Sequence, residues 1–174
     1  MNSLLPKLVI TDIDGVWTDG GMYYSTSGEE LKKFNTKDSV GVLFLQLLGI
    51  PVAIMTGENV EVVKRRGSKL NIEHVFLGVK DKLKTALNLC KELNISIDEV
   101  AFVGDEINDL RLLEKVGISA CPSDASVLVK RKVDTILTEK GGEGVFRSFV
   151  MSFLPDDKQE EALALYHKRF DFSQ

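Results

Sequence analysis

The strongest constraint on this chain is the regular alternation of short apolar runs with helix-length amphipathic segments. Five runs are almost continuously hydrophobic: 7–11, 51–55, 74–77, 100–103 and 117–120. Strands that are apolar on both faces are typical of a parallel sheet covered by helices on both sides. Segments with a helical pattern lie at 39–48, 59–70, 81–93 and 107–116. This order predicts an α/β fold with a doubly wound parallel sheet of Rossmann type.

Two segments interrupt the alternation. Residues from about 20 to 35 place aromatic and apolar side chains on either side of a polar turn that contains glycine, which predicts a β-hairpin after the first strand. Residues 155–174 form a charged, helix-like tail, either a final surface helix or an arm on a partner. We therefore expect one domain over residues 1–154, followed by a C-terminal helical tail.

Composition excludes several classes of protein. The 174 residues carry 26 Asp and Glu against 22 Lys and Arg, and a general nucleic-acid binder needs a basic surface instead. The apolar runs are too short to cross a bilayer, and the N-terminus lacks the apolar core of a signal peptide. Cys90 and Cys121 lie in apolar patterns without metal-ligand spacing. We expect reduced thiols, a cytoplasmic location, and neither nucleic acid nor membrane as a partner.

Polar residues follow four of the expected strands, at the edge of an open sheet where ligands bind. They are Asp12, Asp14, Thr56, Gly57, Glu58, Lys82, Asp105 and Asp109. Carboxylates without histidine or thiolate favour a hard divalent ion, above all Mg²⁺. A threonine hydroxyl, glycine amides and a lysine suit a phosphate group. Together they predict phosphoryl transfer through an aspartyl phosphate.

The same residues, in the same order, resemble the four motifs of the haloacid dehalogenase superfamily. The motifs are Asp12-Ile13-Asp14-Gly15-Val16, Thr56-Gly57, Lys82, and Gly104-Asp105-Glu106-Ile107-Asn108-Asp109. Four motifs at successive strand ends are far more specific than the first alone, and the resemblance spans nearly the whole domain.

The resemblance implies a role for each motif residue. Asp12 would be the nucleophile and a metal ligand. Asp14 would protonate the leaving alkoxide and then activate water, while its backbone carbonyl touches the metal. Thr56, Gly57 and Lys82 would bind the phosphoryl group. Asp105 would ligate Mg²⁺, and Asp109 would orient Lys82 or a metal-bound water. The competing interpretation of Lys82 is a surface lysine, since Lys80 and Lys84 are its neighbours. The competing interpretation of Asp109 is a solvated helix residue.

The spacing of the motifs leaves no room for a cap domain. Only residues 13–55 separate Asp12 from Thr56, and only residues 57–81 separate Thr56 from Lys82. A hairpin and one helix fill the first interval, and one helix and one strand fill the second. Selective hydrolysis of a phosphomonoester needs shielding from water. We therefore expect the missing wall to come from a second copy, through the aromatic hairpin.

A capless chain with such a hairpin is similar to the bacterial sugar-acid phosphatases of this superfamily. That similarity implies a homotetramer and a 2-keto-3-deoxy sugar acid phosphate as the substrate. The eight-carbon enzymes usually carry Thr-Gly-Arg where this chain has Thr56-Gly57-Glu58. The resemblance thus implies keto-deoxynononate 9-phosphate ahead of 3-deoxy-D-manno-octulosonate 8-phosphate.

Three residues are candidates for binding this substrate: Glu58, Arg66 and Lys69. On a helix they would share one face, with the two cations on the substrate carboxylate and Glu58 on its hydroxyls. The competing interpretation is a solvated run of charge around residues 64–66.

Two functions of other classes are also considered. A phosphoacceptor signalling domain combines an aspartate, Mg²⁺, threonine and lysine on a similar sheet. It carries its nucleophile after the third strand, where this chain has only Leu77-Gly78, and it lacks an acid equivalent to Asp14. A non-catalytic tetramerising scaffold is disfavoured by the intact motif residues.

Overall fold

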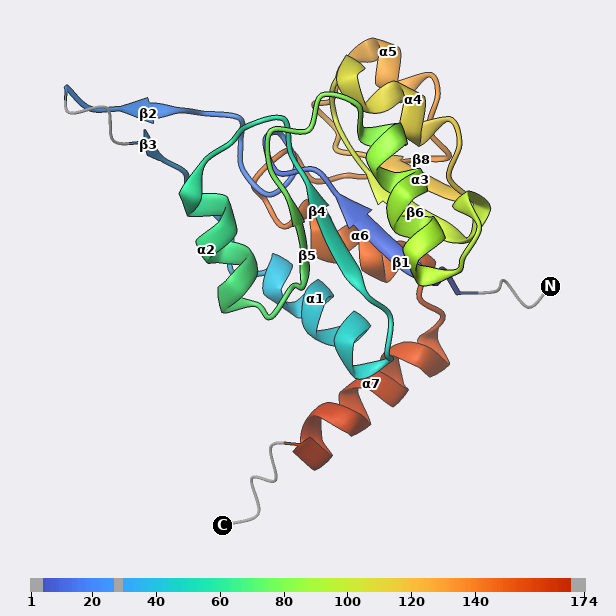
Figure 1. Cartoon of the computed structure of the whole chain (residues 1–174). Coiled ribbons are helices and arrows are strands. Elements are labelled where there is room, and N and C mark those ends of the chain that lie inside the picture. Colours follow the sequence, from blue (N-terminus) through green and yellow to red (C-terminus); the bar gives the residue numbers. More distant parts are fainter. Residues whose placement is uncertain (1–4, 27–29, 170–174) are drawn as a thin grey trace.

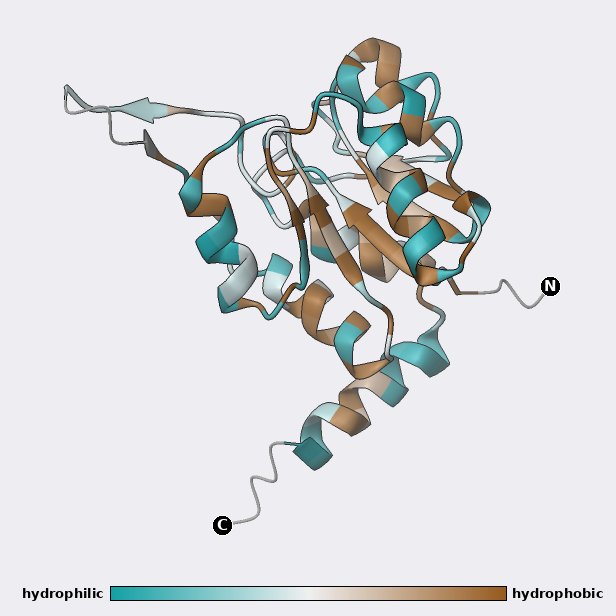
Figure 2. Ribbon diagram, in the orientation of Figure 1, coloured by the Kyte–Doolittle hydropathy of each residue, from teal (hydrophilic) through white to brown (hydrophobic). Residues whose placement is uncertain are grey.

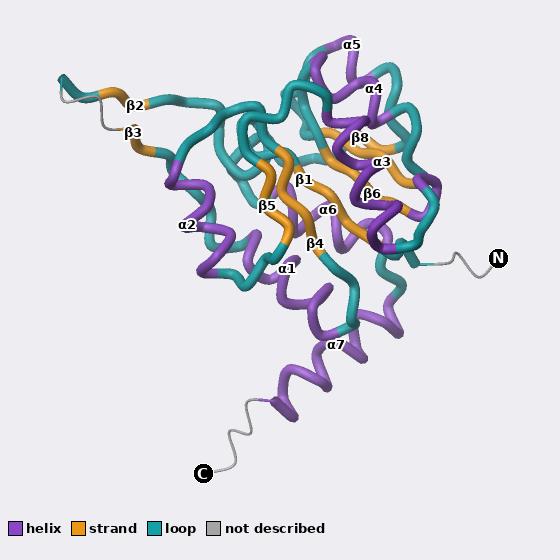
Figure 3. Tube along the Cα trace, in the orientation of Figure 1, coloured by secondary structure: helices purple, strands orange, loops and turns teal. Residues whose placement is uncertain are grey.

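The computed structural model describes residues 5–26 and 30–169 of the chain. Its centre is one sheet of six parallel strands in the order β5-β4-β1-β6-β7-β8, enclosed by helices (Figures 1 and 3). The strands are β1 (Leu8–Thr11), β4 (Val52–Met55), β5 (His74–Phe76), β6 (Val100–Val103), β7 (Ile118–Cys121) and β8 (Thr135–Ile136). The predicted α/β class and doubly wound parallel sheet are confirmed.

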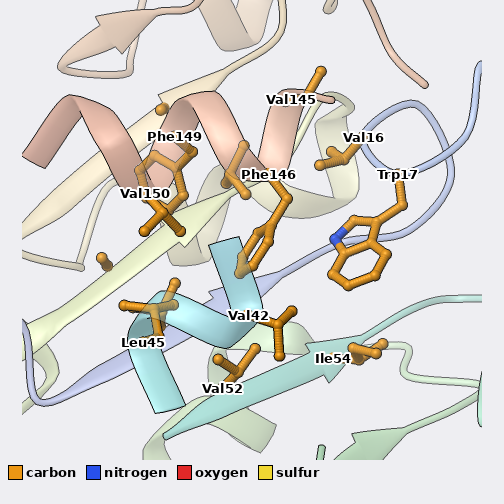
Figure 4. Close-up of a cluster of buried hydrophobic side chains, with 14 of the residues drawn as sticks. Val16, Trp17, Val42, Leu45, Val52, Ile54, Val145, Phe146, Phe149 and Val150 are labelled. Carbon is orange, nitrogen blue, oxygen red and sulfur yellow. The ribbon is translucent and has the colours of Figure 1, made fainter. Parts of the chain in front are cut away.

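Helices cover both faces of this sheet. On one face lie α1 (Asp38–Leu47), α2 (Glu61–Lys69) and α6 (Val145–Phe153), and on the other α3 (Lys82–Leu93), α4 (Leu110–Leu113) and α5 (Val127–Lys130). Successive strand residues alternate between two hydrophobic clusters, as Val9 joins the first while Leu8 and Ile10 join the second. Figure 4 shows the first cluster, with Phe146 and Phe149 of α6 facing α1. This double burial explains why the strand sequences are continuously apolar.

Several elements differ from those the sequence predicts. The expected helix 107–116 is a 3₁₀ turn, η2 (Ile107–Asp109), followed by the short α4. The reason is the Asp109 carboxylate, which accepts the N–H groups of Asp105 and Glu106 and so closes a tight turn. The pattern does not predict β8 or α5, which are too short to show a period, or α6, which follows a glycine-rich turn with Gly142 and Gly144 at positive φ.

The predicted hairpin projects from the body of the molecule (Figure 1). Strands β2 (Tyr23–Tyr24) and β3 (Glu30–Leu31) pair antiparallel, with Tyr23 opposite Leu31, and residues 27–29 of its turn lie outside the described residues. Met22, Tyr23, Tyr24 and Leu31 are all exposed. Between β1 and β4 the described chain forms only this hairpin and α1, and between β4 and Lys82 only α2 and β5. The prediction that the chain has no cap domain is confirmed.

The C-terminal helix α7 (Asp156–Arg169) extends away from the sheet and contacts α1 (Figures 1 and 2). Most residues of α7 are hydrophilic, and Ala162 is buried. The boundary expected at 154/155 falls in the link between α6 and α7, and the division of the chain there stays a prediction. Among the described helices, none combines the length and the apolar character needed to span a bilayer.

Candidate active site

The sheet register places the motif residues at one edge. Thr11, the last residue of β1, pairs with Ile54 of β4 and Val103 of β6, so the residues that follow these strands lie side by side. There the chain forms a cavity of about 400 Å³. Six of the predicted site residues line it: Asp12, Asp14, Thr56, Gly57, Glu58 and Asp105.

Lys82 and Asp109 lie beneath this cavity in a buried chain of charges. The Nζ of Lys82 is 2.8 Å from Oδ2 of Asp12 and 2.5 Å from Oδ1 of Asp109. The Lys82 side chain is 1% exposed, whereas Lys80 and Lys84 are exposed. Asp109 is fully buried, so the interpretation of residue 109 as a solvated helix residue is wrong.

The electrostatic balance of the site is unfavourable to ionised carboxylates. Burial, together with the charge of Asp109, raises the pKa of Asp12 to about 7 although Lys82 acts against it. Burial and the charges of Asp12 and Asp109 raise the pKa of Asp105 to about 8. Carboxylate oxygens of these three aspartates lie within 4.8 Å of one another. One lysine therefore does not compensate the negative charge gathered here.

The donor set fits a hard divalent cation. Oδ1 of Asp12 is buried and has no hydrogen-bond partner, and Asp105 faces the same cavity. Asp109 belongs to the same cluster, but both its oxygens already accept hydrogen bonds, from Lys82 and from the backbone. Asp12 and Asp105 are thus the side chains that suit such an ion, since oxygen ligands without nitrogen or sulfur favour Mg²⁺.

Gly15 allows Asp105 to reach this position. The residue adopts φ +77°, and a Cβ built there would lie 1.9 Å from Oδ2 of Asp105. Any side chain at position 15 would displace that carboxylate. The glycine of the first motif is therefore a steric requirement of the site.

Asp14 is held by one oxygen only. Its Oδ1 accepts hydrogen bonds from Oγ1 of Thr18, at 3.1 Å, and from Nζ of Lys32, at 2.7 Å. Its Oδ2 is buried and has no hydrogen-bond partner. Lys32 is a residue that sequence reasoning missed, because a lysine beside a second lysine, Lys33, in a hairpin arm gives no signal of burial.

Thr56 and Gly57 begin a short loop at the end of β4. The Thr56 side chain is buried at the cavity wall, and its Oγ1 accepts the backbone N–H of Glu58 at 3.3 Å. The loop is held by the N–H of Val79, which donates to the Thr56 carbonyl at 2.9 Å. The hydroxyl and the exposed Gly57 therefore face the cavity on a fixed backbone.

The expected common helix face of Glu58, Arg66 and Lys69 is wrong. Helix α2 begins at Glu61, so Glu58 lies in the loop before it, exposed at the cavity. Lys69 is exposed at the last turn of the helix, and neither it nor Arg66 lines the cavity. The structure brings only Glu58 to the site.

Arg66 instead joins separate parts of the core. Its guanidinium lies over the rings of Trp17 and Phe34, with centroid distances of 5.7 and 5.6 Å. It donates to the Asn35 carbonyl and to Oγ of Ser39, both at 3.1 Å. These contacts also contradict the interpretation of residue 66 as part of a solvated charge run.

Four further polar residues line the cavity without having been predicted as site residues: Asp19, Glu106, Asn108 and Asp124. Glu106 and Asn108 lie inside the last motif. Asp124 follows β7 and accepts the N–H of Gly141 at 3.0 Å. The end of β7 is a strand end like the other four, so this position offered a signal that the sequence analysis did not use.

Known proteins resemble this chain in sequence and in structure. A sequence profile described as haloacid dehalogenase-like hydrolase matches residues 57–149. The 3-deoxy-D-manno-octulosonate 8-phosphate phosphatase KdsC of Haemophilus influenzae is 37% identical over 141 residues, 81% of this chain and 78% of the relative. The enzyme of the same name from Escherichia coli K12 is 37% identical over 157 residues, 90% and 84% of the two chains.

Solved structures agree with these matches. The 3-deoxy-D-manno-octulosonate 8-phosphate phosphatase of Moraxella catarrhalis, in complex with magnesium, phosphate and KDO, superposes with a TM-score of 0.87 and 31% identity, over 94% of this chain and 92% of that one. The cobalt-bound phosphatase of Haemophilus influenzae has a TM-score of 0.81 and 32% identity, over 97% and 94%.

Proposed function

The chain belongs to the haloacid dehalogenase-like hydrolases, and we propose that within this family it is a Mg²⁺-dependent phosphatase of a 2-keto-3-deoxy sugar acid phosphate. One observation carries the proposal. Asp12 and Asp14 line the same cavity, and each has one buried oxygen without a hydrogen-bond partner. Two carboxylates at one cavity, each with one oxygen that accepts no hydrogen bond, match the two roles of nucleophile and acid/base.

In the proposed reaction Asp12 is the nucleophile. Its carboxylate attacks the phosphorus, an aspartyl phosphate forms, and the ester P–O bond breaks. Thr56, the amide of Gly57 and Lys82 bind the phosphoryl oxygens. Asp109 fixes Lys82 through the 2.5 Å contact and so keeps the ammonium beside the nucleophile.

Asp14 moves the protons. It donates a proton to the alkoxide oxygen of the leaving sugar, and then accepts one from the water that attacks the aspartyl phosphate. That attack breaks the bond between phosphorus and the Asp12 oxygen and releases inorganic phosphate. The same side chain thus serves both half-reactions.

Mg²⁺ is the cofactor, and Asp12, Asp105 and the backbone carbonyl of Asp14 would hold it. When bound it neutralises charge on the phosphoryl group and on the two carboxylates. The magnesium bound in the Moraxella catarrhalis relative and the acidic cluster of this chain both support the assignment.

For the substrate we propose 3-deoxy-D-manno-octulosonate 8-phosphate, the compound named for the relatives at 37% identity. Keto-deoxynononate 9-phosphate is the second candidate. One observation favours it: Glu58, which replaces the arginine expected of the eight-carbon enzymes, lines the cavity and could accept hydrogen bonds from extra sugar hydroxyls.

A side-by-side assay of phosphate release distinguishes the substrates. We expect turnover of 3-deoxy-D-manno-octulosonate 8-phosphate, loss of activity in EDTA, and recovery on addition of Mg²⁺. Faster turnover of keto-deoxynononate 9-phosphate would contradict the eight-carbon proposal, and Glu58→Arg should then lower the nine-carbon rate selectively. Turnover of neither compound would contradict the proposed function.

We also propose that the chain works as a homotetramer in the cytoplasm. The exposed apolar side chains of the hairpin, Met22, Tyr23, Tyr24 and Leu31, form a surface suited to a second copy. The cavity has no cap domain to shield it, so a neighbouring copy is the available wall. The buried free thiols of Cys90 and Cys121 suit a reducing compartment.

A charged hairpin should separate the copies and expose the site. We expect Tyr24→Glu combined with Leu31→Glu to give a monomer by light scattering and to lower kcat/KM for the sugar acid phosphate about ten-fold or more, because water enters the site. The control is Leu87→Glu, an exposed apolar position on α3 at 46%, outside the hairpin. A fully active monomer would contradict the shared-site proposal.

A further inference from the structure

We propose that Lys32 is a positioning residue for proton transfer, which holds Asp14 through Oδ1 and leaves Oδ2 as the oxygen that exchanges the proton. The inference rests on the proposed function and extends it to a residue outside the four motifs. It concerns how the acid/base carboxylate is oriented, since Lys32 acts through Asp14.

The contacts around Asp14 are asymmetric. Lys32 Nζ lies 2.7 Å from Oδ1, and Thr18 Oγ1 lies 3.1 Å from the same atom. The other oxygen, Oδ2, is buried and has no hydrogen-bond partner, although the Asp14 side chain lines the cavity. Two donors on one oxygen fix the carboxylate plane, and the remaining oxygen is the one available for proton transfer.

The burial of Lys32 makes this contact specific. Its side chain is 0% exposed, whereas that of Asp14 is 28% exposed. A lysine removed from water requires a charged or hydrogen-bonded partner, and an ion pair with one buried member is screened less than a surface pair. By contrast, the neighbouring Lys33 is 69% exposed and pairs with Asp19 at 3.3 Å.

The position of Lys32 follows from the strand that precedes it. Leu31 ends β3 and is 64% exposed, and side chains of an extended chain alternate between two sides, so Lys32 turns inward. The β3 arm of the hairpin therefore carries both Leu31 of the exposed apolar surface and Lys32, which contacts Asp14. A catalytic carboxylate held this way is preorganised, because it need not search for its productive rotamer.

The test is a double-mutant cycle between Lys32→Met and Asp14→Asn. The substrate is whichever of the two sugar acid phosphates the wild type hydrolyses faster, and the rate is measured in single turnovers at saturation. We expect Lys32→Met to lower the rate about ten-fold with KM changed less than about two-fold, since general acid catalysis contributes 10²–10⁴-fold and only its alignment is lost. In the Asp14→Asn background the same substitution should cost less than about two-fold.

Lys33→Met is the matched control, since it removes an exposed lysine from the same arm, and it should retain the wild-type rate. If the two losses in the cycle multiply, Lys32 does not act through Asp14 and the inference is wrong. An unchanged rate in Lys32→Met overturns it equally. Should Lys32→Met not fold, Thr18→Val removes the other donor to Oδ1 in the same cycle. Failure of the proposed function is distinct, because the wild type would then hydrolyse neither phosphate.

Discussion

Asp12→Asn is expected to abolish phosphatase activity and to leave the fold intact. If Asp12 forms the covalent intermediate, an amide in its place has no lone pair suited to attack on phosphorus, and we expect kcat to fall by about 10³-fold or more. The substitution is nearly isosteric. Lys82 keeps its contact with Asp109 at 2.5 Å, so the buried lysine retains a charged partner.

The same variant makes a prediction about stability with a definite sign. Burial is the main cause that raises the pKa of Asp12 from 3.8 to about 7, so stability is lost as the pH rises between these two values and the full penalty is present above about pH 7. A neutral amide removes this penalty. The midpoint of thermal unfolding of metal-free Asp12→Asn at pH 8 should therefore equal or exceed that of the wild type.

Phosphate release and thermal unfolding, measured on the same preparation, check both parts. Asp98→Asn is the control, because Asp98 is exposed and precedes β6 at the opposite end of the sheet. Retained activity would remove Asp12 from the role of nucleophile. If instead the wild type is also inactive on both sugar acid phosphates, the non-catalytic scaffold becomes the better interpretation.

The architecture could be predicted because burial on both faces leaves a direct trace in the sequence. A strand such as Leu8–Thr11 that contributes to two cores has no polar alternation, and the polar residue that follows it marks the sheet edge. Asp12, Thr56 and Asp105 were found this way, and the structure brings them to one cavity. Elements of two to four residues, such as β8 and α5, leave no such trace.

The environment of charged side chains could not be predicted in the same way. Arg66 looks solvated in its run of charges, but Trp17 and Phe34, from segments distant in the sequence, place two rings around its guanidinium. Lys32 is buried against Asp14, a residue 18 positions earlier in the chain. The sequence does not show the burial of either residue for the same reason: their partners are not adjacent in the sequence.

For Lys82, by contrast, the prediction is confirmed as to burial. The motif identifies it among three nearby lysines that charge alone does not distinguish. The chain offers Lys80, Lys82 and Lys84 at the start of α3, and only Lys82 is buried, between two carboxylates. Burial alone would lower its pKa, but Asp12 and Asp109 raise it above the ordinary value. Lys82 therefore stays charged, and the fold depends on that charge.

Lys82→Met is accordingly expected to lose activity and to destabilise the fold by about 3–5 kcal/mol, the usual cost of removing one member of a buried ion pair. The loss should be larger at pH 8 than at pH 5. Without the ammonium, the pKa of Asp12 rises further above about 7. At pH 5 the folded carboxylate is protonated with or without Lys82, so Asp12 adds nothing to the loss. At pH 8 the wild-type carboxylate is ionised beside Lys82, whereas the variant must bury an uncompensated charge or bind a proton. Chemical denaturation in EDTA at both pH values measures this difference.

Two companion variants separate charge from packing in that measurement. Lys84→Met, an exposed neighbour on the same helix, should change stability by less than about 0.5 kcal/mol. Lys82→Met combined with Asp109→Asn should recover part of the lost stability at pH 8, because the amide removes a buried carboxylate that the lysine no longer neutralises. If the double variant is no more stable than Lys82→Met, then packing and not charge balance accounts for the loss. Activity should stay absent in the double variant, since the ammonium beside Asp12 is needed for the phosphoryl group whatever the stability of the fold.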